Sequence, residues 1–276
     1  MRRLILLLLL APLLVWADVN KKDGTTISTA STLDGETGLA KADGQTIASS
    51  GGAVTVTQSS SPASNGGGDA TLEVSFGSLP AAGSTVVMAF SMYGTSGFGT
   101  TCTDNQGNGA YTRAEIATES GNGDTAEIWY KANIGSPSGT FTVTCTATVS
   151  VYAWGVLLEL DGVNNSNPIR DTGTNTGHAT STDASVTSAG SSAAVGDLAV
   201  VTVVVKISSS NVNLGANATT GYTNVSLQQN YSAITSQSAD YKEIGSAGSQ
   251  SANWSHDAAT PDPYGWACVM AIFEAA

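Results

Sequence analysis

From about residue 69 to the C-terminus, apolar and polar positions alternate in short segments. An apolar repeat of helical period never persists for three turns. The segments are rich in Val, Thr, Ile or aromatic residues and are bounded by Gly, Asn, Ser or Pro, a pattern typical of strands separated by turns. The predicted strands are Thr71–Phe76, Ser84–Met92, Ala110–Thr118, Ala126–Ala132, Thr140–Thr148, Val151–Leu160, Ala184–Ser188, Leu198–Ile207, Tyr222–Gln228, Ile234–Glu243, Gln250–Ser255 and Tyr264–Phe273, with a further short strand at Ala53–Thr57. The pattern therefore predicts an all-β fold.

Two of these strands are apolar on both faces. They are Tyr152–Leu160 and Tyr264–Phe273, and neither shows the alternation expected of a strand with one face in water. Such strands are typical of the middle of a large structure. We therefore expect an antiparallel β-sandwich, jelly-roll-like, with packed sheets.

The strand series is repeated along the chain with an offset of 111 or 112 positions. This spacing predicts two internally duplicated halves, at about 69–163 and 181–276. We expect both halves to build one domain, 59–276, and two tandem sandwiches are the alternative that the Asn/Thr/Gly-rich link Asn164 to Thr182 also permits. The matching motifs are Gly83-Ser84-Thr85-Val86-Val87 with Gly196-Asp197-Leu198-Ala199-Val200, Tyr111-Thr112 with Tyr222-Thr223, Tyr130-Lys131 with Tyr241-Lys242, and Tyr152-Ala153-Trp154 with Tyr264-Gly265-Trp266.

The first 17 residues have the pattern of a secretory signal peptide. Arg2 and Arg3 precede an apolar run from Leu4 to Trp16, and small residues stand at Val15 and Ala17. The run is shorter than the roughly 20 apolar residues that a membrane-spanning helix needs. No later stretch is long and apolar enough to span a membrane. The expected localisation is therefore secreted, extracellular or at the cell surface.

Residues 18–58 form a loosely repetitive segment. Asp23-Gly24, Asp34-Gly35 and Asp43-Gly44 each mark a tight turn flanked by strand-forming residues. Such units are too small to bury a core, so the segment is interpreted as an arm that could mediate self-assembly or as a flexible linker. It resembles the short Asp-Gly repeats near the ends of phage and environmental bacterial structural proteins.

Charge narrows the classes of partner. The chain has 22 acidic and 10 basic residues and a net charge of −12, which disfavours nucleic acid and anionic lipid surfaces. Charged residues make up only 12% of the chain. The exposed polar surface must therefore consist mostly of Ser, Thr, Asn and Gly.

The chain has three cysteines, and in an oxidising compartment one disulfide and one free thiol are expected. Cys102 and Cys145 lie in Thr-rich strand-like segments, whereas Cys268 lies in an apolar run. We expect a Cys102–Cys145 disulfide and a buried free Cys268, with three reduced thiols as the alternative. No Cys or His pair has the spacing of zinc ligands.

A wider resemblance rests on turn and core residues. These are Thr103-Asp104-Asn105-Gln106-Gly107-Asn108, Tyr111-Thr112, Ile128-Trp129-Tyr130 and Leu160-Asp161-Gly162-Val163. Over about 69–276 the chain resembles uncharacterised secreted β-sandwich modules, jelly-roll or lectin-like, of bacterial and environmental genomes. The resemblance implies an adhesive, carbohydrate-binding or structural role and transfers no site residues.

The chain shows no recognisable catalytic centre. It has two histidines, His178 and His256, and lacks the Gly-x-Ser-x-Gly motif of many hydrolases. Glu127 and Trp129 share a strand face, as do Arg113 and Glu115, which suits either sugar binding or an ordinary solvent-exposed face. The Asp104–Asn108 segment is interpreted as a hairpin turn stabilised by Asp and Asn side chains rather than as a calcium loop. No cofactor is expected.

The strongest ligand-binding candidate lies where the second half gains residues that the first half lacks. Trp and Tyr offer flat apolar faces for sugar rings, and Asp bonds to hydroxyl groups, although a packed Trp beside a Pro-stiffened loop is the simpler alternative. The chain is thus predicted to be a non-catalytic binding or adhesion module for extracellular polysaccharide or a cell-surface glycan. The alternative is a subunit of an extracellular or virion-like fibre, and a secreted hydrolase has least support. The candidate residues are Trp254, His256, Asp257, Asp262 and Tyr264.

Overall fold

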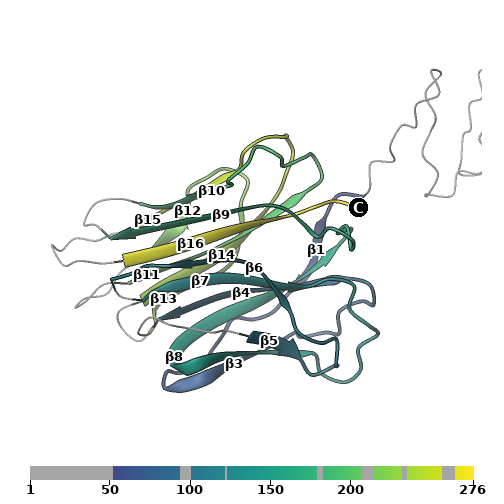
Figure 1. The fold of residues 1–276 in the computed structure, drawn as a ribbon, viewed down its shortest axis with the longest axis horizontal. Coiled ribbons are helices and arrows are strands. Elements are labelled where there is room, and N and C mark those ends of the chain that lie inside the picture. Colours follow the sequence, from purple (N-terminus) through teal and green to yellow (C-terminus); the bar gives the residue numbers. More distant parts are fainter. Residues whose placement is uncertain are drawn as a thin grey trace, which may run out of the picture. The chain divides into compact units, whose positions relative to one another are not determined.

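The described part of the chain is built from β-strands alone. The computed structural model describes residues 52–93, 101–121, 123–178, 183–206, 214–231, 235–256 and 265–276. All regular elements in these ranges are strands (Figure 1), which confirms the predicted all-β class. Nothing in these ranges is a helix able to cross a membrane. The predicted signal peptide and residues 18–51 of the predicted arm lie outside them.

The strands belong to one compact unit, Gly51–Ala276, and pair antiparallel throughout. They are β1 (Thr55–Ser59), β2 (Ala63–Ser64), β3 (Asp69–Ser75), β4 (Thr85–Tyr93), β5 (Thr101–Asp104), β6 (Thr112–Thr118), β7 (Thr125–Lys131), β8 (Thr142–Asp161), β9 (Ile169–His178), β10 (Ala184–Thr187), β11 (Leu198–Lys206), β12 (Leu214–Asn217), β13 (Thr223–Tyr231), β14 (Thr235–Glu243), β15 (Ser251–His256) and β16 (Gly265–Phe273).

The first half forms a sandwich of two layers joined by one long strand. The C-terminal part of β8 pairs with β4, whose other neighbour β7 pairs with β6. The N-terminal part of β8 pairs with β3 and β5 in a second layer. The three residues 148–150 between these parts are exposed, so β8 turns from one layer into the other at a solvent-facing corner. Leu72, Met88 and Phe141 belong to the core between the layers.

The second half forms another two-layer sandwich. A five-stranded sheet has the order β13-β14-β11-β16-β9, and a three-stranded sheet has the order β10-β15-β12. Val186 and Trp254 of the small sheet share a core with Val201 and Met270 of the large sheet. The described strands therefore stack in four layers, which follow one another from bottom to top in Figure 1.

The two sandwiches share a third core between their central sheets. Val87 and Ile128 of the first half and Val200 and Val269 of the second half are fully buried there. Every residue of β11 is buried, and alternate residues face different cores: Val200 faces this shared core, whereas Val201 faces the outer one. The continuous apolar runs thus lie in the middle layers, as predicted. We expected the two halves to build a single pair of packed sheets. Instead, each half is itself a two-layer sandwich, and the two sandwiches pack against each other.

Both central sheets have the same strand order and one irregularity in common. The order β8-β4-β7-β6 of the first matches β16-β11-β14-β13 of the second. Thr112 pairs with Tyr130, and Thr223 pairs with Tyr241, followed in both cases by a register shift at corresponding positions. These features agree with an internal duplication, which stays a prediction.

The predicted strands are found with small shifts of their ends, with two corrections. The segments Thr140–Thr148 and Val151–Leu160 are one strand, β8. The link Asn164 to Thr182 contains the ten-residue strand β9, which completes the edge of the five-stranded sheet beside β16. Strands β2 and β12 were also missed, and β5 was expected only as a strand-like segment around Cys102.

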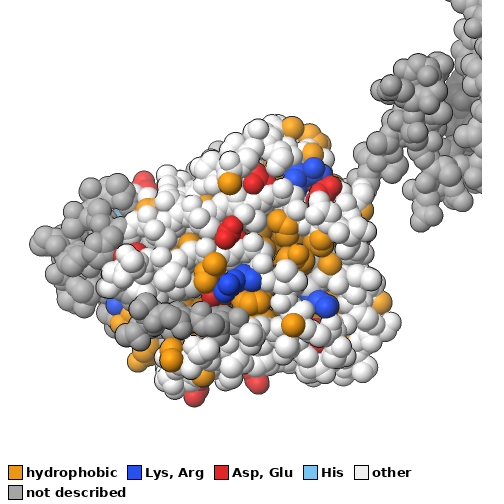
Figure 2. Space-filling view, viewed as in Figure 1, with side chains coloured by type: hydrophobic (Ala, Val, Ile, Leu, Met, Phe, Trp, Pro, Cys, Tyr) orange, Lys and Arg blue, Asp and Glu red, His pale blue; other side chains and the backbone are white. Residues whose placement is uncertain are grey.

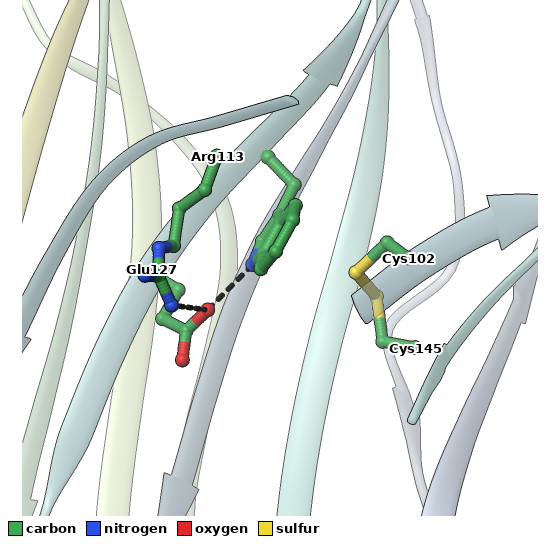
Figure 3. The surroundings of a disulfide bond; sticks show 5 residues. Cys102, Arg113, Glu127 and Cys145 are labelled. Atoms are coloured by element: carbon green, nitrogen blue, oxygen red, sulfur yellow. Dashed lines mark hydrogen bonds and ion pairs between the residues drawn. A yellow bond between two sulfur atoms is a disulfide. The ribbon is translucent and has the colours of Figure 1, made fainter. Parts of the chain in front are cut away.

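The predicted disulfide is present. Cys102 of β5 and Cys145 of β8 are directly opposite each other in the ladder, and both are buried (Figure 3). Cys268 is a buried free thiol, as expected, and burial raises its pKa. The disulfide fixes the short strand β5 to the outer layer of the first sandwich.

Loss of this disulfide should destabilise the protein. A cross-link between residues separated by 43 positions restricts the unfolded chain, so we expect the double substitution Cys102→Ala/Cys145→Ala to lower the free energy of unfolding by about 2–4 kcal/mol. Denaturant titration of both proteins measures this loss. Dithiothreitol should weaken the wild type and leave the double variant unchanged, since both retain Cys268. A variant as stable as the oxidised wild type would contradict the prediction.

Candidate functional site

Trp254, the principal residue predicted to bind a ligand, is buried in the core of the second sandwich. Trp254 lies on β15 with no exposed surface, and its Nε1 donates to Oδ2 of Asp240 on β14 at 3.0 Å. A ring in this position cannot stack on a sugar, so the prediction for Trp254 is wrong and the packed alternative holds. His256, at the end of β15, is partly exposed. The other three candidates, Asp257, Asp262 and Tyr264, lie outside the described residues.

Trp254 instead belongs to a hydrogen-bonded group around a buried carboxylate. Asp240 is 1% exposed and accepts hydrogen bonds from Trp254, from Nδ2 of Asn224 at 2.8 Å and from Oγ of Ser238 at 3.0 Å. Burial raises the pKa of Asp240, and the three hydrogen bonds act against this rise without cancelling it. The group orients side chains between the two layers of the second sandwich.

The first sandwich contains a similar pair of a carboxylate and an indole. Nε1 of Trp129 donates to Oε2 of Glu127 at 2.6 Å, and Glu127 has no exposed surface. Nη1 of Arg113 lies 3.7 Å from the same oxygen (Figure 3). The Arg113 guanidinium lies over the Trp129 ring, at 5.3 Å from the ring centroid. Glu127 and Trp129 do share a face, but the face is buried, so it is neither a solvent-exposed face nor an open sugar-binding face.

Arg113 and Glu115 do not share a face, contrary to expectation. A register shift between them turns the two side chains toward different layers. Arg113 reaches Glu127, whereas Oε2 of Glu115 accepts a hydrogen bond from Oγ1 of Thr172 on β9 at 2.7 Å. Glu115 therefore connects the two sandwiches.

The Asp104–Asn108 segment is a side-chain-stabilised turn, as interpreted from the sequence. Oδ1 of Asp104 accepts from the backbone N–H of Gln106 at 2.9 Å, and its Oδ2 accepts from Nδ2 of Asn108 at 3.0 Å. Asn105 bonds to the backbone of Thr140 and Thr142. In the ranges given above, His, Cys, Asp and Glu side chains form no group of three or more that could hold a metal ion.

A pocket of mixed polar and apolar lining lies on the exterior between β1, the end of β8 and the segment before β4. Its volume is about 370 Å³. The Glu159 carboxylate accepts from Nε2 of Gln58 at 2.7 Å and from the backbone N–H of Ala81 at 2.6 Å. Oγ of Ser78 donates to Oε1 of Gln58 at 2.6 Å. The lining residues, which we call the Gln58–Glu159 pocket, are Thr57, Gln58, Ser78, Leu79, Ala81, Ala82, Ser84, Glu159 and Asp161.

This pocket combines polar side chains with one exposed apolar side chain. Gln58 and Asp161 present amide and carboxylate groups, and Leu79 contributes an apolar side chain that is 44% exposed. Sequence reasoning missed it because its residues come from three separate segments, and none of them forms a motif. Its only sequence signal was the Glu159 carboxylate inside an otherwise apolar strand.

A cluster of polar side chains lies between the two central sheets, next to the C-terminal ends of β4 and β11. Glu119 and Asp124, at the two ends of the β6–β7 turn, are 2% and 0% exposed. Nζ of Lys206, the last residue of β11, lies 3.7 Å from the centroid of the Tyr93 ring. We call Glu119, Asp124, Lys206 and Tyr93 the seam cluster, because it joins the edges of the two sandwiches.

Comparisons with protein-family models, with curated proteins and with solved structures find no match to this chain. The functional argument therefore rests on the geometry alone. The surface in Figure 2 adds one general property: most of the visible face is uncharged, with separate Lys, Arg, Asp and Glu side chains, as the composition predicts.

Substitution of Trp254 tests whether its buried indole N–H stabilises the protein through the hydrogen bond to Asp240. Trp254→Phe keeps an aromatic ring in the core but removes the N–H that Asp240 accepts, so we expect a loss of about 1–3 kcal/mol in the free energy of unfolding. The folded-state pKa of Asp240 is raised above its unfolded value and would rise further in the variant. Stability therefore falls as pH rises through the interval between these pKa values, and the deficit of the variant should be larger at pH 8 than at pH 4.

Thermal or denaturant unfolding at both pH values measures this deficit. The matched control is Trp266→Phe, since Nε1 of that buried indole has no hydrogen-bond partner, and its deficit should be smaller and independent of the Asp240 ionisation. Equal stability of Trp254→Phe and wild type would contradict a stabilising hydrogen bond from the indole to Asp240.

Proposed function

We propose that the protein is a secreted, non-catalytic binding or adhesion module for extracellular carbohydrate, and that the Gln58–Glu159 pocket is where the ligand binds. The pocket is the observation on which this proposal depends. Its amide, hydroxyl and carboxylate groups match the donors and acceptors of sugar hydroxyls, and its volume of about 370 Å³ suits a small part of a glycan chain.

Other features support an extracellular setting. The first 17 residues have the pattern of an export signal. The Cys102–Cys145 disulfide is typical of oxidising compartments. The low fraction of charged residues and the abundance of Ser, Thr and Gly fit a surface-exposed β protein.

A glycan array with the purified protein tests the ligand class. We expect binding to at least one extracellular glycan. Gln58→Ala or Leu79→Ala should then weaken the binding about tenfold, which corresponds to a loss of about 1.4 kcal/mol for one hydrogen-bonding or apolar contact. Isothermal titration with the glycan found on the array gives these affinities.

Val149→Ala is the matched control for Leu79→Ala. Both side chains are 44% exposed, but Val149 lies at the solvent-facing corner of β8, whereas Leu79 lines the pocket near the far end of that strand. No binding to any glycan by the wild type would reject the carbohydrate proposal. Binding that is equally strong in both pocket variants would place the ligand elsewhere on the protein. The fibre-subunit alternative predicts self-association that is lost when residues 18–50 are removed, a deletion that leaves β1 and the compact unit Gly51–Ala276 intact.

A further inference from the structure

The seam cluster brings an amine and two carboxyl groups into one buried space between the sandwiches. Lys206 is 8% exposed, and its side chain belongs to the face of β11 that also contributes Val200 and Val204 to the shared core. The amine therefore points between the central sheets rather than into solvent. An amine in this position needs a partner, because a buried unpaired charge is costly.

Asp124 lies next to Tyr93, the residue whose ring is covered by the Lys206 amine. Thr125 pairs with Met92 in the ladder between β7 and β4, so the preceding residue, Asp124, falls next to Tyr93. The Asp124 side chain has no exposed surface, and neither Oδ1 nor Oδ2 has a hydrogen-bond partner. Burial raises the pKa of Asp124 to about 8, with Lys206 acting to lower it and Glu119 to raise it. A neutral carboxyl group is more easily attacked by an amine than a carboxylate is.

Glu119 completes the group from the other side of the turn. Its backbone N–H donates to the carbonyl oxygen of Asp124 at 2.8 Å, so the two residues are direct neighbours across the hairpin. Its side chain packs against Gly265, where an added Cβ would come within 2.6 Å of Oε2. Gly265 pairs with Lys206 in the ladder between β16 and β11. The absence of a side chain at Gly265 thus lets the Glu119 carboxyl group enter the space next to Lys206.

We propose that Lys206 and Asp124 form an intramolecular amide bond that covalently joins the two sandwiches. The bond would link the end of β11 in the second half to the start of β7 in the first. Its formation requires the Lys206 side chain to turn from the Tyr93 ring toward the Asp124 carboxyl group. This inference is independent of the proposed carbohydrate function.

The reaction balances without any further reactant. Glu119 accepts a proton from the Lys206 ammonium, and the free Nζ lone pair attacks Cγ of Asp124 to form the new C–N bond. Glu119 returns this proton to the leaving carboxyl hydroxyl, so that the Cγ–O bond breaks and one molecule of water departs. Glu119 then accepts the second proton from the acylated nitrogen, which leaves a neutral amide and a protonated Glu119. The buried position favours the amide, because the ion pair loses its hydration while the neutral product does not need it.

The mass of the purified full chain tests the bond directly. Measured under reducing and denaturing conditions, the wild type should be lighter than its calculated mass by one water molecule. After tryptic digestion, Lys206 should resist cleavage, and a branched peptide should connect residues 114–131 with residues 171–242. Reduction removes the Cys102–Cys145 disulfide from the comparison.

Substitutions assign the bond to its residues. Lys206→Arg and Asp124→Ala should restore the calculated mass, and Glu119→Gln should leave most of the chain unlinked. Lys242→Arg is the matched control, since Nζ of Lys242 also lies over a tyrosine, at 5.6 Å from the Tyr222 ring centroid, and this variant should keep the mass deficit. A wild type with the full calculated mass would overturn the proposal, and this measurement requires no variant to fold.

Discussion

The shared apolar core between the two central sheets is the constraint on which the rest of the structure depends. Strands β4, β11 and β16 are buried on both faces, so neither sandwich could keep its central sheet in water if the other were absent. The residues facing the shared core are largely Val, Ala and Leu, which fill the space between two flat surfaces without polar groups. Burial of this surface makes the halves one unit although each also has a core of its own.

This constraint also decides where polar side chains can lie in the interior. A buried carboxylate must receive hydrogen bonds or a counter-charge. Glu127 and Asp240 meet this need with an indole N–H on the outer side of each central sheet, away from the shared core. Within the shared core, the acidic and basic groups of the seam cluster occur only at the strand ends. The rest of the interface is mostly apolar, and its polar side chains are hydrogen-bonded, as Thr202 is to the Ser238 carbonyl oxygen and Thr172 to Glu115.

The sequence predicted well those elements whose pattern depends on burial alone. The doubly apolar strands β8 and β16 were placed in the interior because no exposed strand could have that composition. Strand β9 was missed, since its Asn, Thr and Gly residues resemble a linker. It is nevertheless held by backbone hydrogen bonds to β16, and Gly173 and Gly177 allow close approach of the Thr187 backbone and the Trp266 ring. A pattern of apolar positions cannot reveal a strand whose side chains are mostly polar and which has Gly at the two points of close approach.

The candidate sites were harder to predict for a related reason. Whether Trp254 faces water depends on which layer covers β15, and its partner Asp240 comes from another sheet. In a four-layer stack, the central sheets are covered on both faces, so a ligand can reach only the outer layers, the sheet edges and the strand ends. The Gln58–Glu159 pocket satisfies this condition because β1 is an edge strand beside β8.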